Sequence, residues 1–331
     1  MGIKKLGVLN ISCEVFMQLF TSTANQMIYL FALIIIGFVL SKIGVLPDGT
    51  EKIIAKLENN IFIPALVMGT FISNFTVSRI SSAGVLFASS FALMVIIIPL
   101  SIFIPRLIVK DKYTRNIYTY GLAFSNFGFM GNSVVSALFP NIFMEYLIFT
   151  LPLWILIYLW GVPVLLMPND EKVSIGKRLK NFLNPMFIAM LVGMIIGILG
   201  LKLPSSLNTA VTTLGNCMSP MAMILTGVTV AKINIKKVLT DYKIYIVSVI
   251  RLIAMPLVFI AIVAFFELPS TFLICAICSL AMPLGLNTIV IPSAYGRDTS
   301  TAAGMALISH VLSCITIPIV FLIATKILGL T

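Results

Sequence analysis

Apolar runs long enough to cross a lipid bilayer recur along almost the whole chain, and this feature restricts the possible folds most. A membrane-spanning helix needs about 20 mostly apolar residues. Ten such segments occur, at approximately 25–45, 53–73, 80–104, 114–138, 142–167, 185–201, 206–231, 243–266, 270–295 and 300–328. Only 10% of the residues are charged, against about a quarter in soluble domains. Since backbone polar groups in hydrocarbon must be satisfied internally, the pattern predicts an all-α integral membrane protein.

Basic residues gather in the connections on one side of the predicted membrane. The loops after the first, third, fifth, seventh and ninth spans hold most of the Lys and Arg residues. The positive-inside rule therefore predicts a multi-pass protein of the plasma membrane whose two termini are both extracytoplasmic. The longest cytoplasmic connection is 168–184, and residues 1–24 are expected to be a leader in which Met17 is an alternative start. These loops account for the net charge of +11, so we expect no nucleic-acid partner.

Sequence landmarks of the first half recur in the same order in the second half. Five of them repeat at offsets of 155 to 157 residues, and the clearest pair is Asn132 in GFMGNSVV and Asn287 in PLGLNTIV. The halves, 25–167 and 185–331, hold five predicted spans each, so the second half enters the membrane from the opposite side. The sequence therefore predicts two inverted five-helix repeats.

The fourth and ninth spans carry polar and helix-breaking residues that a lipid-facing helix avoids. In the fourth span we expect Gly128 and Gly131 to flank a break, and in the ninth Pro283 and Gly285 mark one. A broken helix exposes backbone N–H groups at a new N-terminus, which favours anions. We therefore expect both breaks to form one anion-binding site near mid-membrane. Its candidate residues are Ser125, Asn126, Gly128, Gly131, Asn132, Ser133, Tyr158, Pro283, Gly285, Asn287 and Thr288.

Each of these residues, and three others, also has a plainer interpretation. The polar groups of the broken spans, taken singly, are as consistent with kinked structural helices as with a site. For Arg251 in the eighth span we favour extension toward the lipid headgroups over a place beneath the site. For His310 we favour a structural hydrogen bond over a proton relay. For Glu58 in the second span we favour an interfacial position over a coupling carboxylate.

Motifs of enzymes and metal sites are missing from the sequence. It has no phosphate-binding G-x-x-x-x-G-K-[ST] motif, no H-E-x-x-H motif and one histidine. Cys275 and Cys278 have C-x-x-C spacing without a second pair or nearby histidines, so we expect them to be packing residues. We therefore predict that the protein is not an enzyme and has no cofactor and no bound metal.

Several stretches resemble the auxin efflux carrier family, in its short prokaryotic members. The resemblance rests on SNFGFMGNSVV, NPMFIAMLVGMIIG, MSPMAMILTGVTVAK and AMPLGLNTIVIPSAYG, and it covers the chain from about residue 24. It implies ten spans in two inverted repeats in which the broken helices four and nine cross, a bile-acid-symporter-like or NhaA-like fold. The family's crossover asparagine falls on Asn126, whereas the internal repeat singles out Asn132, and both stay candidates. The family's plant carriers have charged residues in span three that 80–104 lacks.

The resemblance also implies that the helices form two domains with different roles. Helices 1, 2, 6 and 7 would form a scaffold that holds a homodimer together, and helices 3–5 and 8–10 would form a transport domain that moves like an elevator. We therefore predict a secondary transporter for small organic anions such as auxin-like acids or dicarboxylates. The alternative is a membrane-embedded receptor or sensor that binds such a ligand without moving it, and a channel is a weaker third candidate. Substrate, direction and coupling ion stay open.

Overall fold

The computed structural model describes most of the chain. The described residues are 21–330 apart from 23, 27, 77–79, 168–184 and 233–234. All regular structure within them is helical, which confirms the all-α class. Most of the predicted leader, with Met17, and the long connection 168–184 lie outside the described residues.

The first half of the chain begins with the helix Ala24–Lys42. The elements that follow are α2 (Thr50–Leu57), the π-helical turn η1 (Glu58–Phe62), α3 (Ile63–Asn74), α4 (Ile80–Ile108), α5 (Lys112–Ala123), the π-helical turn η3 (Phe127–Gly131), α6 (Asn132–Leu138), the short 3-10 turn η4 (Pro140–Ile142), α7 (Phe143–Leu156) and the π-helical η5 (Ile157–Leu166).

The regular structure of the second half, where it is described, is also helical. Its elements are α9 (Pro185–Ile198), α10 (Ser205–Asn216), α11 (Met218–Lys232), α12 (Ile235–Thr240), α13 (Tyr242–Val249), the π-helical turn η7 (Ile250–Ala254), α14 (Met255–Val263), α15 (Ser270–Leu280), α16 (Asn287–Ala294) and α17 (Ser300–Leu328).

Six helical segments of the described chain are long and apolar enough to cross a membrane. They are Ala24–Lys42, Gly84–Ile108, Pro140–Leu166, Ser205–Lys232, Tyr242–Val263 and Ser300–Leu328. The other four predicted spans correspond to helices that are short, interrupted or broken: α9, the run from α2 to α3, the pair α5 and α6, and the pair α15 and α16. The protein is therefore a multi-pass membrane protein.

Two π-helical turns each end two residues before a proline. The turn η1 precedes Pro64, and η7 precedes Pro256. Proline lacks the N–H group and its ring crowds the carbonyl four residues earlier, so the wider turn relieves the clash. Glu58 begins the first turn and Arg251 is the second residue of the other. Two charged residues thus stand at the places where the helical hydrogen-bond ladder is disturbed.

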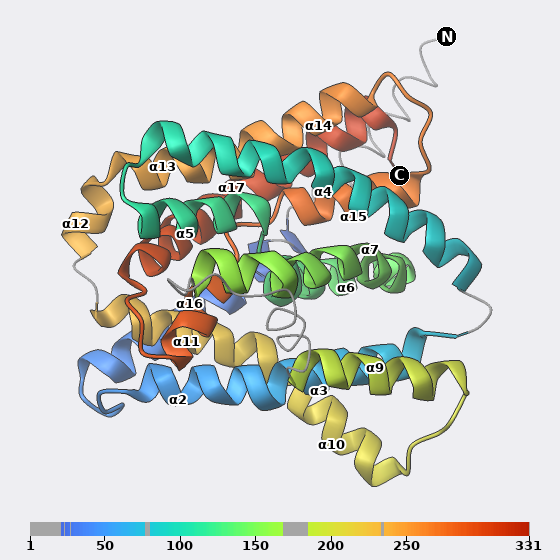
Figure 1. Cartoon of the computed structure of the whole chain (residues 1–331), viewed down its shortest axis with the longest axis horizontal. Helices are drawn as coiled ribbons and strands as arrows, with labels where there is room; N and C mark the ends of the chain where they lie inside the picture. The colour runs from blue at the N-terminus through green and yellow to red at the C-terminus, as the bar shows by residue number, and fades with distance from the viewer. Residues whose placement is uncertain are drawn as a thin grey trace.

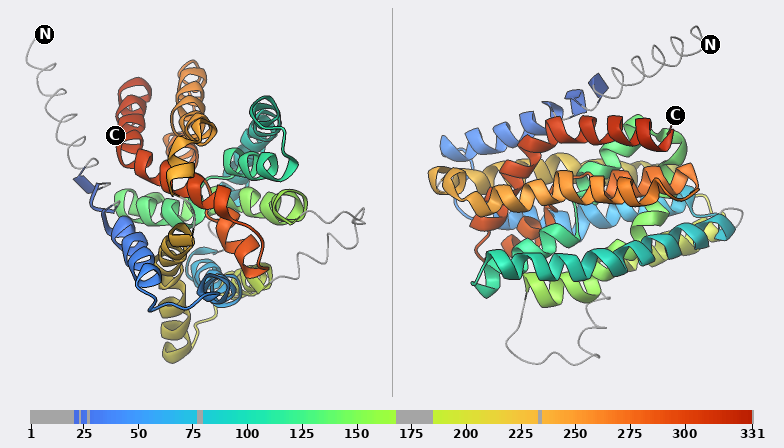
Figure 2. Two further views of the ribbon diagram at one scale, coloured as in Figure 1. Left: turned by 90° about the vertical axis from the view of Figure 1, so that its left-hand side faces the viewer. Right: turned by 90° about the horizontal axis from the view of Figure 1, so that it is seen from above.

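The long helices run side by side along the longest axis of the molecule (Figure 1, and the right-hand view of Figure 2). The helices α2, α3, α9 and α10 lie on one side, α4, α13 and α14 lie on the other, and α5, α6, α7 and α16 lie between them (Figure 1). The helices α3 and α9 meet backbone to backbone: a Cβ at Gly193 would lie 2.8 Å from the carbonyl oxygen of Met68, and one at Gly197 would lie 2.6 Å from that of Phe71. Glycine permits this close packing, as expected for small residues four apart.

Candidate functional site: a crossover of two broken helices

The helices α5 and α15 both stop in the middle of the bundle, and the extended segments that follow them touch. Ser125 and Leu284 form an isolated antiparallel bridge. The backbone N–H of Asn126 donates to the carbonyl oxygen of Pro283 over 2.8 Å. The two broken helices therefore meet in extended backbone. We call residues 124–126 and 281–286 together the crossover.

The first helix breaks before the two glycines that were expected to flank the break, which corrects the prediction. Phe124 leaves the helix with φ −122° and ψ 112°, whereas Gly128 and Gly131 lie inside η3. A Cβ at Gly128 would lie 2.7 Å from Cζ2 of Trp154, and one at Gly131 would collide with the hydroxyl of Tyr146. These glycines make room for aromatic side chains of α7.

The second crossover segment needs a residue without a side chain where the two backbones touch. A Cβ at Gly285 would lie 2.8 Å from the carbonyl oxygen of Phe124 and 3.1 Å from that of Ser125. The carbonyl of Gly285 accepts a hydrogen bond from the hydroxyl of Thr288 over 2.7 Å, at the start of α16. Pro283 and Gly285 lie in the break between α15 and α16, where the sequence placed them.

Asn126 is held inside the crossover by both ends of its side chain. Its Oδ1 accepts from the N–H of Met130 over 3.3 Å, and its Nδ2 lies 2.9 Å from Nε2 of His310. His310 Nδ1 lies 2.7 Å from the carbonyl oxygen of Ala306, which can only accept. The histidine is therefore the neutral Nδ1–H tautomer, and its Nε2 accepts from Asn126. This agrees with the structural interpretation of His310 and shows that the Asn126 amide is committed to protein partners.

Arg251 binds the ends of both broken helices, so the expectation that it reaches the headgroups is wrong. The residue is 1% exposed. Its Nη1 donates to the carbonyl of Leu122 over 2.8 Å, and its Nη2 donates to that of Ser279 over 2.9 Å. Those carbonyls belong to the last turns of α5 and α15, where helix dipoles concentrate negative charge. A longer contact of 3.5 Å joins Nε to the carbonyl of Met282 in the crossover.

The remaining candidates differ in how their side chains are used. The hydroxyl of Ser125 donates to the carbonyl of Ser279 over 2.7 Å. Asn287 is 7% exposed, and the buried hydroxyl of Tyr120 lies beside its amide without a well-aligned hydrogen bond. The Ser133 side chain lies outside what the structure describes. Ser125 and Asn287 are thus buried within the crossover region.

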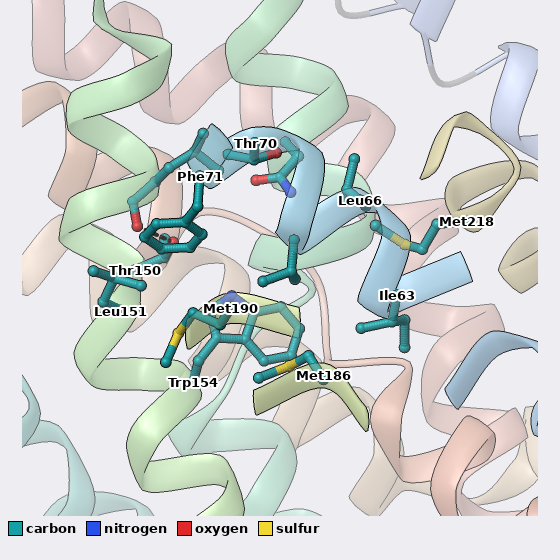
Figure 3. Close-up of a pocket in the computed structure, with 13 residues that line it drawn as sticks. Ile63, Leu66, Thr70, Phe71, Thr150, Leu151, Trp154, Met186, Met190 and Met218 are labelled. Carbon is teal, nitrogen blue, oxygen red and sulfur yellow. Dashed lines mark hydrogen bonds between the residues drawn. The ribbon is translucent and has the colours of Figure 1, made fainter. Parts of the chain in front are cut away.

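A small cavity lies beside the crossover, between α3, α9 and α11 on one side and α6 and α7 on the other (Figure 3). Its volume is about 30 Å³, room for one or two waters but for no organic substrate. It is lined by Ile63, Leu66, Val67, Thr70, Phe71, Asn132, Leu147, Thr150, Leu151, Trp154, Met186, Met190 and Met218. Asn132 lines it with a side-chain oxygen that has no hydrogen-bond partner among the described residues.

Aromatic residues connect the cavity to the crossover. Trp154, which lines the cavity, packs edge-on against Phe127 with ring centroids 5.0 Å apart. Tyr158, which the sequence proposed as a pocket wall, instead stacks behind Trp154 at 6.4 Å and is not among the lining residues. The tryptophan therefore occupies the place expected for the tyrosine.

A family model described as "Membrane transport protein" matches residues 22–321 of the chain. The chain belongs to this family, the auxin efflux carriers. The family assignment made from the sequence is thereby confirmed, and the protein is a membrane transporter. No curated protein matches the chain.

In this member of the auxin efflux carrier family, two charged residues are buried that the sequence analysis did not expect inside the protein. Arg251 is the one charged residue in the apolar stretch of its span. A lone charge in such a stretch needs partners inside the protein, and this pattern could have predicted its burial. Glu58 is 0% exposed, so its carboxyl is buried in the protein and not exposed at the membrane surface. Cys275 and Cys278 are buried free thiols of α15, in agreement with their interpretation as packing residues.

Proposed function

We propose that the protein is a secondary transporter of small organic anions, such as auxin-like acids or dicarboxylates, that binds its substrate in the cavity next to the crossover. The observation that carries this proposal is the crossover itself. The half-helices that continue from it begin at η3 and α16, and helix N-termini favour anions. Arg251 adds a full positive charge, and no described carboxylate forms an ion pair with it. An anion gains electrostatic stabilisation in such a place.

Asn126 and Asn132 were both candidates for contact with the substrate, and we assign that contact to Asn132. The amide of Asn126 already serves Met130 and His310, so binding a substrate would first break those bonds. Asn132 presents an unpartnered oxygen at the wall of the cavity. Its amide group offers donors to a carboxylate once the side chain rotates. In this proposal Asn126 shapes the crossover and Asn132 binds.

The position of the cavity supports elevator-type movement as the second part of the proposal. One wall comes from α3, α9 and α11, which belong to the scaffold of helices 1, 2, 6 and 7, and the other wall comes from α6 and α7 of the transport domain. A substrate held on the transport-domain wall would change sides when that domain slides along the scaffold. At about 30 Å³ the cavity would have to widen to take an organic acid, and sliding of one wall past the other would do this. A homodimer joined through the scaffold would hold the fixed part in place.

Uptake by proteoliposomes tests transport directly. Purified protein reconstituted in lipid vesicles is expected to take up labelled malate or indole-3-acetate faster than protein-free vesicles. A receptor or sensor would bind such an acid without flux under any gradient. Binding without flux would therefore reject the transporter proposal and favour the sensor.

The variant Asn132→Asp tests the place of binding. It keeps the size of the side chain and sets a negative charge against an anionic substrate, so we expect at least a tenfold loss of uptake, or about 1.4 kcal/mol. Asn60→Asp is the matched control, because Asn60 is exposed and its side chain bonds only the carbonyl of Lys56 in the described contacts. Equal uptake by both variants would remove Asn132 from the site.

A further inference from the structure

Glu58 is a buried carboxyl group for which the transport scheme above has no role. Its side chain is 0% exposed, and neither Oε1 nor Oε2 has a hydrogen-bond partner among the described residues. An ionised carboxylate in such a place costs several kcal/mol unless a cation or hydrogen-bond donors compensate it. What surrounds the carboxyl therefore decides its charge.

The elements packed around η1 bring no compensating charge to Glu58. The helices α3, α9, α10 and α16 contain no Asp, Glu, Lys, Arg or His residue. On α11 the charged group is Lys232, whose ammonium lies at the far end of the helix and pairs with Glu51 at 2.8 Å and Asp48 at 3.1 Å. On α2 itself, Lys52 and Lys56 are exposed. Within the described chain, a neutral, protonated carboxyl is the form that this environment tolerates.

Glu58 also stands at a boundary that the proposed movement would disturb. The neighbouring residue Asn59 reaches the carbonyl oxygen of Val290 in α16 over 3.4 Å. The helix α16 is the half-helix that continues from the crossover, whereas η1 continues into α3, whose Ile63 lines the cavity. The helix α16 is one of the elements packed on η1, so its movement would change the surroundings of this segment, and a carboxyl that water reaches ionises readily.

We propose that Glu58 is a proton-binding site, protonated while α16 packs against η1 and deprotonated when α16 moves away from it. Because η1 runs into α3 of the proposed scaffold, the carboxyl stays in place, and water reaches it from one side of the membrane before the transport domain moves and from the other side afterwards. A proton bound from one side and released to the other then couples substrate movement to protons. The part about coupling rests on the proposed transport function, and the part about protonation does not. A metal cation is the less suitable ligand, because the described residues contain no cluster of three or more His, Cys, Asp or Glu side chains.

Infrared spectroscopy of the full chain in lipid tests the protonation. We expect wild type at neutral pH to show the C=O stretch of a protonated carboxylic acid, and Glu58→Gln to lack that band. The matched control is Glu51→Gln on the preceding helix α2, which removes a carboxylate paired with Lys232 and should leave the band unchanged. A wild-type spectrum without an acid band assignable to Glu58 would overturn the proposal. Carboxylate bands of Glu58 that respond to sodium ions would overturn it in favour of a cation site.

Transport of malate under an imposed pH gradient tests the coupling. Wild-type vesicles should accumulate malate with the gradient, Glu58→Gln should lose that accumulation, and Glu58→Asp should retain it because it keeps a titratable group. Wild-type accumulation that ignores the gradient would refute coupling. If no wild-type flux is found with any substrate, the proposed function fails, while the infrared result still decides whether Glu58 binds a proton.

Discussion

Replacing Arg251 tests whether the crossover depends on one guanidinium that binds two helix ends. The side chain donates short hydrogen bonds to Leu122 in α5 and to Ser279 in α15. Arg251→Met keeps much of the apolar stem but leaves both carbonyls without this donor. Arg251→Lys keeps the charge, yet its compact ammonium lacks the planar fork that reaches two helices at once.

The expected cost of Arg251→Met follows from these two contacts. A hydrogen bond to a charged group contributes about 1.5–3 kcal/mol, so two contribute about 3–6 kcal/mol. The methionine also removes the cost of burying the guanidinium, which offsets part of that loss. We therefore expect a net destabilisation of about 2–4 kcal/mol for Met and about half of it for Lys.

Denaturant unfolding in detergent measures the difference. Trp154 and Trp160 are suitable fluorescent probes, because their rings pack on Phe127 and Phe124 next to the crossover. The matched control is Arg106→Met, since Arg106 is an exposed residue at the end of α4 and should cost less than about 0.5 kcal/mol. An Arg251→Met variant as stable as this control would refute the argument that the guanidinium holds the crossover together.

Two further substitutions test the crossover. Gly285→Ala should destabilise the protein by about 1–3 kcal/mol, because its Cβ would press against the carbonyl of Phe124. The control Gly84→Ala should be neutral or stabilising, since a Cβ there would have no atom within 4 Å. Equal melting temperatures of the two variants would count against the contact at Gly285. Asn126→Ala and His310→Ala, alone and combined, should show a coupling free energy of about 1 kcal/mol in the same unfolding assay. Strict additivity would mean that the 2.9 Å contact between them contributes nothing.

Local chemistry explains why the sequence located both broken helices. Proline and glycine disturb a helix wherever they stand, and polar residues in an apolar run need partners, so Pro283, Gly285 and Asn126 were recognisable without any tertiary information. The residue at which the first helix breaks was not recognisable in this way. Gly128 and Gly131 leave room for the side chains of Trp154 and Tyr146. Such tertiary contacts produce no local sequence pattern.

The two buried charged groups were misplaced for the same reason. The partners of Arg251 are carbonyls 129 and 28 residues away, and every residue type has a carbonyl, so the chain carries no side-chain signal for them. Glu58 sits in LENNIF, whose polar composition is typical of an interface, and its burial results from the packing of other helices over η1. Burial of a single residue depends on all neighbouring elements, whereas helix breaking depends on the residue itself.

Buried polar contacts join one set of elements of the bundle to one another. Arg251 joins α5 and α15, Asn126 joins the crossover to α17 through His310, and the N–H of Leu284 donates to Ser309 of α17 over 3.3 Å. Moving any of these elements alone would expose or break buried hydrogen bonds. Across the cavity, by contrast, the walls are mostly Leu, Ile, Val, Met, Phe and Trp side chains, whose contacts have no directional requirement. Under the proposed elevator movement the transport domain would slide along this apolar boundary, and η1, which carries Glu58, packs against α16 of the proposed transport domain. The charge of Glu58 would then change the cost of that sliding.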